Sequence, residues 1–147
     1  MRGKRELSVA KSALDKDMIK RYDDAILENE RLACKSIDEF SASAKELLVL
    51  SKERSKKKRE ASGERRAELA VACENLRSRI SWYLNVIGTS AASAASLAQR
   101  SSLKGAMKMR LSYGKKRVSL LEKYEKAEAE YSKAQSYMLP EEKVKVG

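Results

Sequence analysis

Apolar residues recur along the chain at steps of three and four positions, which is the period of an α-helix. The first such stripe includes Leu14, Met18, Tyr22, Ile26, Ile37, Phe40 and Leu47. Charged residues fill most of the positions between them. The pattern predicts one helix over residues 6–58, roughly 80 Å long at 1.5 Å per residue.

The apolar pattern breaks where basic residues and a glycine cluster. Lys56 to Arg59 would place cations in the last turn of the first helix, where the helix dipole favours them. Gly63 suits the position just after a helix, because it tolerates the left-handed conformation that ends many helices. We therefore expect a turn over residues 59–63 and a second helix over residues 64–101, whose stripe includes Leu69, Leu76, Ile80, Leu84 and Ile87.

The two stripes match as the faces of an antiparallel hairpin. A turn near Gly63 would put Phe40 opposite Leu84 and Ile26 opposite Ala98. The bulky residues of the first stripe would then face the small residues of segment 88–95. Large side chains opposite small ones let two helices approach closely.

A third helical stripe covers residues 103–138 and stops before Pro140. Ser101, Ser102 and Gly105 favour a kink at its start, because serine and glycine weaken a helix interior. The third helix could continue the second or bend back against the first, and the pattern leaves both arrangements open. Residues 140–147 are expected to form a flexible tail.

Strands have almost no support, since β-branched residues never alternate with polar ones over a usable window. Ala, Leu, Glu, Lys and Arg dominate the 147 residues, and there is one proline. This is the composition of long helices. We predict an all-α fold: a single elongated domain over residues 1–139, built as an antiparallel helical hairpin or coiled coil with a possible kinked third helix.

Charge is distributed unevenly along the chain. The net charge is +11, and no Asp or Glu occurs between Asn75 and Leu121. Such a block favours an anionic partner. The candidate binding residues are the basic turn and the cations of the block's second half: Lys56, Lys57, Lys58, Arg59, Arg65, Arg66, Arg100, Lys104, Lys108, Arg110, Lys115, Lys116 and Arg117.

The second half of this block is amphipathic. On a helical wheel Leu103, Met107 and Leu111 share one face, and lysines and arginines border that face. The arrangement suits a helix lying on an anionic bilayer, with basic side chains reaching the phosphates. It equally suits an acidic groove of a protein, or an ordinary bundle helix with a solvated rim.

Catalytic and metal chemistry have little basis in this sequence. Histidine is absent, and the two cysteines, Cys34 and Cys73, would not meet in the hairpin, so we expect free thiols, no metal and no cofactor. Most carboxylates fall on predicted solvated faces, where they would not be tuned for acid–base catalysis. Segment 80–99 lacks charge but is too rich in serine and alanine to favour membrane insertion. No targeting segment is recognised, so a cytoplasmic protein, possibly peripheral to a membrane, is expected.

These features predict a non-enzymatic helical scaffold or interaction module. Several apolar positions are not used by a two-helix hairpin, which favours a homodimer or a helical protein partner; they are Leu7, Leu27, Leu48, Leu50, Met109 and Leu120. In plan and charge the predicted hairpin resembles the membrane-binding helical domains of the BAR type, although no motif of that family is present. The alternatives are a structural coiled-coil subunit that docks an acidic partner, and non-specific nucleic-acid binding. The latter is less favoured because the aromatic residues fall mostly on or beside the apolar stripes.

Overall fold

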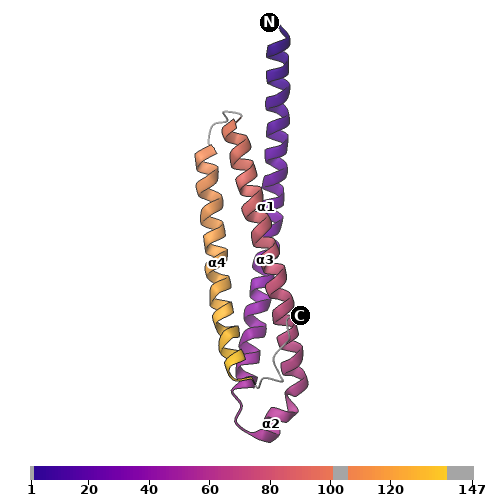
Figure 1. The fold of residues 1–147 in the computed structure, drawn as a ribbon, viewed down its shortest axis with the longest axis vertical. Coiled ribbons are helices and arrows are strands. Elements are labelled where there is room, and N and C mark those ends of the chain that lie inside the picture. Colours follow the sequence, from indigo (N-terminus) through magenta and orange to yellow (C-terminus); the bar gives the residue numbers. More distant parts are fainter. Residues whose placement is uncertain (1, 101–105, 139–147) are drawn as a thin grey trace. The chain divides into compact units, whose positions relative to one another are not determined.

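The computed structural model describes residues 2–100 and 106–138, and it places side chains for residues 15–100 and 115–138. The described chain forms α1 (Arg2–Ser51), α2 (Lys56–Ala61), α3 (Gly63–Arg100) and α4 (Ala106–Ser136), shown in Figure 1. No strand occurs among these residues, so the all-α prediction is confirmed. The predicted kink at residues 101–105 and the predicted tail at residues 140–147 lie outside the described residues.

The chain reverses direction in two steps rather than in one turn. α1 ends at Ser51, seven residues before the predicted end at Lys58. Ser55 then begins the short helix α2, and its hydroxyl accepts the backbone N–H of Lys58 at 3.5 Å. Serine is a favoured residue at this capping position, so Lys56 to Lys58 begin a helix instead of ending one. Ser62 closes α2 and leads directly into α3.

The earlier end of α1 changes which residues of α1 and α3 face each other. Ala98 packs with Ile19, whereas the sequence predicted Ile26 at that place. At this place the register therefore differs from the predicted one by seven residues, and α1 also ends seven residues earlier than predicted. Seven residues are about two helical turns, so the same stripe still points inward.

The contacts divide the chain into two compact units: unit 1 contains residues 1–32 and 83–119, and unit 2 contains residues 33–82 and 120–147. Unit 2 has the aromatic core. The buried ring of Phe40 on α1 has its centroid 5.8 Å from that of Tyr124 and 5.7 Å from that of Tyr131, both on α4. In this unit the third helical section therefore packs back against the first, which is one of the two arrangements left open by the sequence.

In unit 1, α1 contributes a small core with α3. Ile19 packs with Leu97 and Ala98, and the ring of Tyr22 lies against them. Gly88 of α3 lies beneath the guanidinium of Arg117 from α4. The approach is close, since a Cβ atom added at Gly88 would be 3.1 Å from the Arg117 Cζ. The segment of small residues on α3, residues 88–95, was expected to face apolar residues of α1. At Gly88 it instead accommodates the charged side chain of Arg117 from α4.

Three exposure predictions need correction. Met18, which belongs to the first predicted apolar stripe, is 43% exposed. Leu120 is only 5% exposed, although it was expected to remain free for a partner; in unit 2 it is covered within the chain itself. Trp82 is 63% exposed, although most aromatic residues were expected on or beside the apolar stripes. Leu27 remains exposed as expected, and the side chains of Leu7 and Met109 lie outside the described set.

The aromatic core of unit 2 predicts a large cost for truncating Phe40. Phe40→Ala should lower the free energy of unfolding by about 3–5 kcal/mol, because it leaves a cavity where two tyrosine rings meet. Urea unfolding followed by circular dichroism measures this change. Val49→Ala is the control, since Val49 is 70% exposed and its truncation should cost less than about 0.5 kcal/mol. A Phe40→Ala loss as small as that of the control would contradict this account of the core.

Candidate functional site

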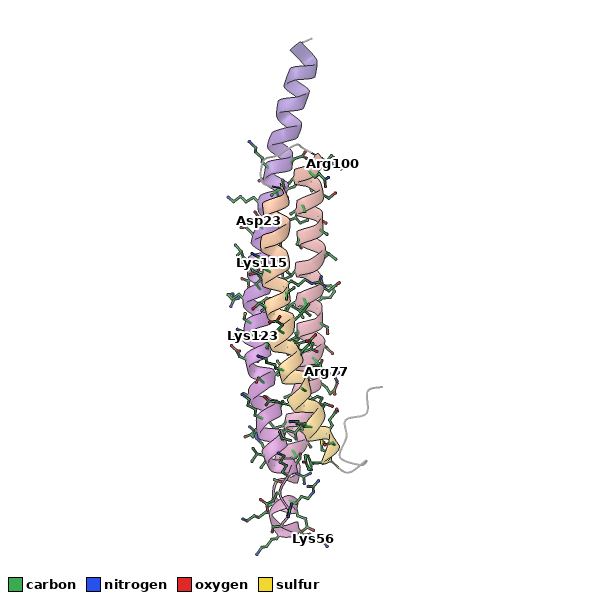
Figure 2. The ribbon with its side chains drawn as sticks, turned by 90° about the vertical axis from the view of Figure 1, so that its left-hand side faces the viewer. Asp23, Lys56, Arg77, Arg100, Lys115 and Lys123 are labelled. Atoms are coloured by element: carbon green, nitrogen blue, oxygen red, sulfur yellow. The ribbon has the colours of Figure 1, made fainter. Side chains whose placement is uncertain are left out.

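The lysines of α2 form the most available basic cluster in the described part of the chain. Lys56, Lys57 and Lys58 are all exposed, and no residue of α2 is buried. Figure 2 shows the labelled Lys56 extending outward from α2. Among the described residues, no carboxylate lies within ion-pair distance of these three lysines. Lys52 and Arg54, both exposed, precede them and extend the positive charge.

Two arginines of the predicted binding set instead hold the chain reversal in place. Arg59 donates one hydrogen bond to the backbone carbonyl of Ser51 and another to that of Tyr137, both at 2.7 Å. It thereby joins the end of α1 to the end of α4. Arg66, only 4% exposed, donates to the carbonyl of Arg59 at 2.6 Å and to the Ser62 hydroxyl at 3.1 Å. Arg59 and Arg66 therefore have structural roles in unit 2.

Arg65 is exposed, but carboxylates of unit 2 compensate its charge. Its guanidinium lies 2.7 Å from the Glu46 carboxylate on α1 and 3.6 Å from that of Glu68 on α3. Exposed pairs of this kind contribute about 0–1 kcal/mol to stability. Arg65 consequently adds less free positive charge to the surface than the lysines of α2 do.

The second half of the acid-free block lies in unit 1. Arg100, Lys115, Lys116 and Arg117 are exposed, whereas the side chains of Lys104, Lys108 and Arg110 lie outside the described set, as do those of Leu103, Met107 and Leu111. Lys116 pairs with Glu30 of α1 at 3.8 Å, and Arg117 covers Gly88. Part of this basic segment therefore contacts its own chain. Figure 2 labels Arg100 and Lys115, which have no ion-pair partner among the described residues.

The segment of α1 in unit 1 supplies the acidic counterpart. Six acidic residues lie between positions 15 and 30. Burial raises the pKa of Asp23, and Asp24 raises it further; burial also raises the pKa of Glu30 against the opposing charge of Lys116. One carboxylate oxygen of each has no hydrogen-bond partner among the described residues. Because the sequence left the position of the third helix open, it gave no sign that Glu30 would pair with the acid-free block.

Arg77, also in the acid-free block, is the centre of a polar network in unit 2. Its guanidinium lies 3.2 Å from the Glu74 carboxylate and 3.3 Å from that of Glu128, and it stacks over the Tyr131 ring at 5.6 Å. The Tyr131 hydroxyl donates to Glu74 at 2.7 Å, and burial raises its pKa. Sequence reasoning missed this network because both carboxylates lie outside the acid-free block and one is on another helix.

The two cysteines are free thiols with different surroundings. Cys73 is fully buried, and burial together with the nearby Glu74 carboxylate raises its pKa to about 12, against the opposing charge of Arg77. Cys34 is half-buried. Only the thiolate is a strong nucleophile, so the Cys73 site disfavours thiol chemistry at neutral pH.

This difference predicts selective alkylation. With iodoacetamide at about pH 8, Cys34 should be modified well before Cys73, because Cys73 is both inaccessible and protonated in the folded chain. Mass spectrometry of the tryptic peptides measures the two rates. In denaturant the two rates should become similar. Equal rates in the folded protein would show that the site of Cys73 opens readily.

Among the described residues, no three His, Cys, Asp or Glu side chains gather as a metal site requires. None of the helices, over the residues described, is both long and apolar enough to cross a bilayer. Among the described residues, α2 is the clearest cluster of exposed cations. No protein-family model, curated protein or solved structure matches this chain.

Proposed function

We propose that the protein is a non-enzymatic helical interaction module that binds anionic membrane surfaces. α2 makes the main contact, and the basic segment around Arg100 and Lys115 makes a second one. The observation that carries the proposal is the run Lys56–Lys58, three adjacent exposed lysines without carboxylate partners among the described residues. Their charges are directed to solvent rather than to the fold.

The energetics fit a reversible peripheral contact. Each lysine or arginine close to an anionic bilayer contributes about 1 kcal/mol, so the three lysines of α2 contribute about 3 kcal/mol. Lys52 and Arg54 add to this attraction. Val49, exposed one turn before Lys52, offers an apolar side chain at the interface. Binding of this strength is sensitive to salt, because the charges are exposed.

A membrane is favoured over a partner whose carboxylate or phosphate groups must be bound in a fixed geometry. Bidentate binding of a carboxylate or phosphate group depends on arginine. Around α2, however, Arg59 and Arg66 are engaged with backbone carbonyls, and Arg65 is paired with glutamates. Apart from Arg54, the cations that remain there are lysines, whose point charges suit the diffuse field of lipid headgroups. An acidic protein groove and nucleic acid are the competing ligands.

Charge reversal on α2 tests the proposal. The variant Lys56→Glu, Lys57→Glu, Lys58→Glu should keep its helix content, because acidic residues are favoured in the first turn of a helix. Its partition onto phosphatidylserine-containing vesicles should fall roughly 100-fold, since attraction of about 3 kcal/mol is lost. Cosedimentation measures the partition, with neutral phosphatidylcholine vesicles as the reference.

A matched control separates the site from net charge. Lys16→Glu, Lys20→Glu, Lys35→Glu makes the same charge change at exposed positions of α1 and should reduce partition far less. Equal losses in both variants would mean that binding follows net charge alone. If the parent protein does not bind anionic vesicles, the membrane proposal is wrong. Binding assays with an acidic peptide and with single-stranded DNA would then decide between the competing ligands.

A further inference from the structure

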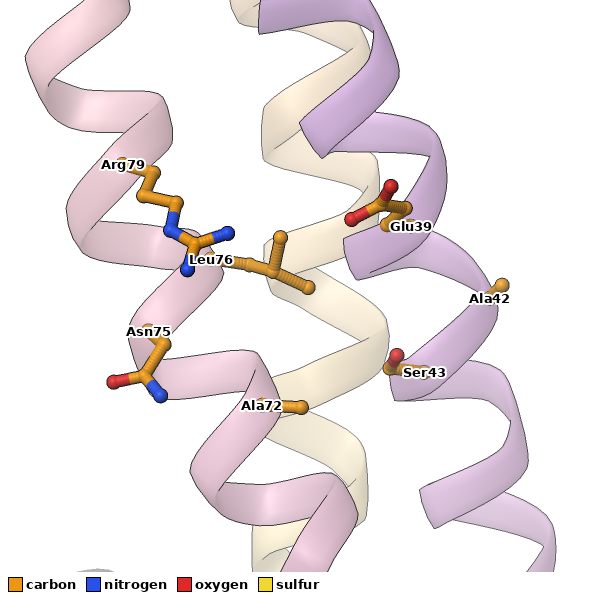
Figure 3. A pocket seen from close by; sticks show the side chains of 7 residues that line it. All are labelled: Glu39, Ala42, Ser43, Ala72, Asn75, Leu76 and Arg79. Carbon is orange, nitrogen blue, oxygen red and sulfur yellow. The ribbon is translucent and has the colours of Figure 1, made fainter. Parts of the chain in front are cut away.

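Unit 2 contains an open groove between α1 and α3. Its volume is about 450 Å³, and its lining is mostly small or polar. Figure 3 shows the residues that line it: Glu39, Ala42 and Ser43 from α1, with Ala72, Asn75, Leu76 and Arg79 from α3. The buried side chain of Leu76 lies between the two helices. The groove therefore has one wall from each helix and an apolar base.

Small residues make the groove accessible to another helix. Ala42, Ser43 and Ala72 have short side chains on both walls, and short side chains allow helix backbones to approach closely. Large apolar residues nearby remain in water. On α3, the exposed Val71 lies one turn before Asn75, and Trp82 lies three residues after Arg79. Exposed apolar groups beside a groove indicate a surface that a protein covers.

The charges at the groove are of opposite sign on its two walls. Glu39 belongs to α1 and Arg79 to α3, and both reach toward the groove at the same end of it in Figure 3. They do not form an ion pair with each other, and neither pairs with another described residue. The groove thus presents one unpaired acid and one unpaired cation at matching heights.

We propose that a second copy of the chain docks on this groove. A two-fold axis running along the groove would set α1 of one copy against α3 of the other. It would also place Glu39 of each copy opposite Arg79 of the other, forming two identical ion pairs. Such a self-complementary surface is what an isologous dimer requires. The four helical segments would enclose Leu76 of both copies, and the groove walls would become the interior of a four-helix arrangement.

The charge pattern favours a second copy over an unrelated helix. A foreign helix would have to carry both signs at the spacing set by this groove, whereas a second copy carries them by symmetry. The sequence favours a homodimer, and the groove between α1 and α3 would be the surface through which the two copies bind. It is independent of vesicle binding, because pairing is measured without lipid and vesicle binding requires no pairing.

Charge exchange across the groove tests the dimer. Glu39→Arg alone and Arg79→Glu alone should each weaken self-association by roughly 100-fold, because like charges then face each other twice. The double variant Glu39→Arg, Arg79→Glu should restore it. An equimolar mixture of the two single variants should form a heterodimer, since one copy then carries two arginines and the other two glutamates. Sedimentation equilibrium measures all four cases.

Trp82 provides an independent readout, because it is the only tryptophan of the chain. Its emission in the parent protein should shift to shorter wavelength as the concentration rises and the groove edge is covered. The single variants should lack this shift, and their mixture should regain it. Lys123→Glu and Glu125→Arg, at exposed positions of α4, are controls that should change neither measurement.

Three outcomes would overturn the proposal. A parent protein that sediments as a monomer at tens of micromolar would exclude the dimer and leave the groove to another partner. Single variants that associate like the parent would place any dimer contact elsewhere. A mixture that stays monomeric although each variant keeps its helix content would exclude the Glu39–Arg79 pairing. None of these results depends on whether the protein binds vesicles.

Discussion

The contacts of unit 2 depend on how α1 is ended. The last carbonyl groups of a helix have no donor within the helix and carry the negative end of its dipole. The guanidinium of Arg59 satisfies this need at Ser51 and reaches the carbonyl of Tyr137 with its other nitrogen, while Arg66 binds the carbonyl of Arg59 itself. This chain of hydrogen bonds fixes the end of α1, the start of α3 and the end of α4 together. The pairing of Glu46 near the end of α1 with Arg65 in the first turn of α3 is consistent with that fixed reversal.

The sequence predicted most of the buried face of α1 and α3, with Met18 as an exception, but it predicted the partners of that face poorly. Ile26, Ile37, Phe40, Ile80 and Ile87 are buried as their spacing indicated. Periodicity is a property of one helix, so it survives an error in the position of the turn. Pairing depends on where the chain reverses, and the chain reverses through the Ser55-capped helix α2 rather than through a single turn at Gly63. Because the shift seen at Ala98 is seven residues, or about two turns, the stripes stay in place although Ile19 rather than Ile26 packs with Ala98.

The acid-free block was only partly informative, because its surface charge also depends on how the chain folds. Counting charges along the chain treats every cation as available, but folding brings carboxylates from elsewhere. Arg77 lies between Glu74 and Glu128, and Lys116 meets Glu30. The surface charge that remains is therefore not the charge of the segment. The lysines of α2 keep theirs because α2 is too short to bury a face against the helices of unit 2.

Arginine and lysine side chains therefore have different roles in unit 2. A guanidinium has five donors in a fixed plane, so it can bind two acceptors at once. Arg59 donates to two carbonyls, Arg66 donates to a carbonyl and a hydroxyl, and Arg77 lies between two carboxylates. An ammonium group is more strongly hydrated and loses more on burial, which keeps Lys56, Lys57 and Lys58 in water. Arg54 and Arg79 depart from this division, since both are exposed arginines with no ion-pair partner among the described residues. A guanidinium left in that state next to an open groove is the kind of group that a protein interface uses.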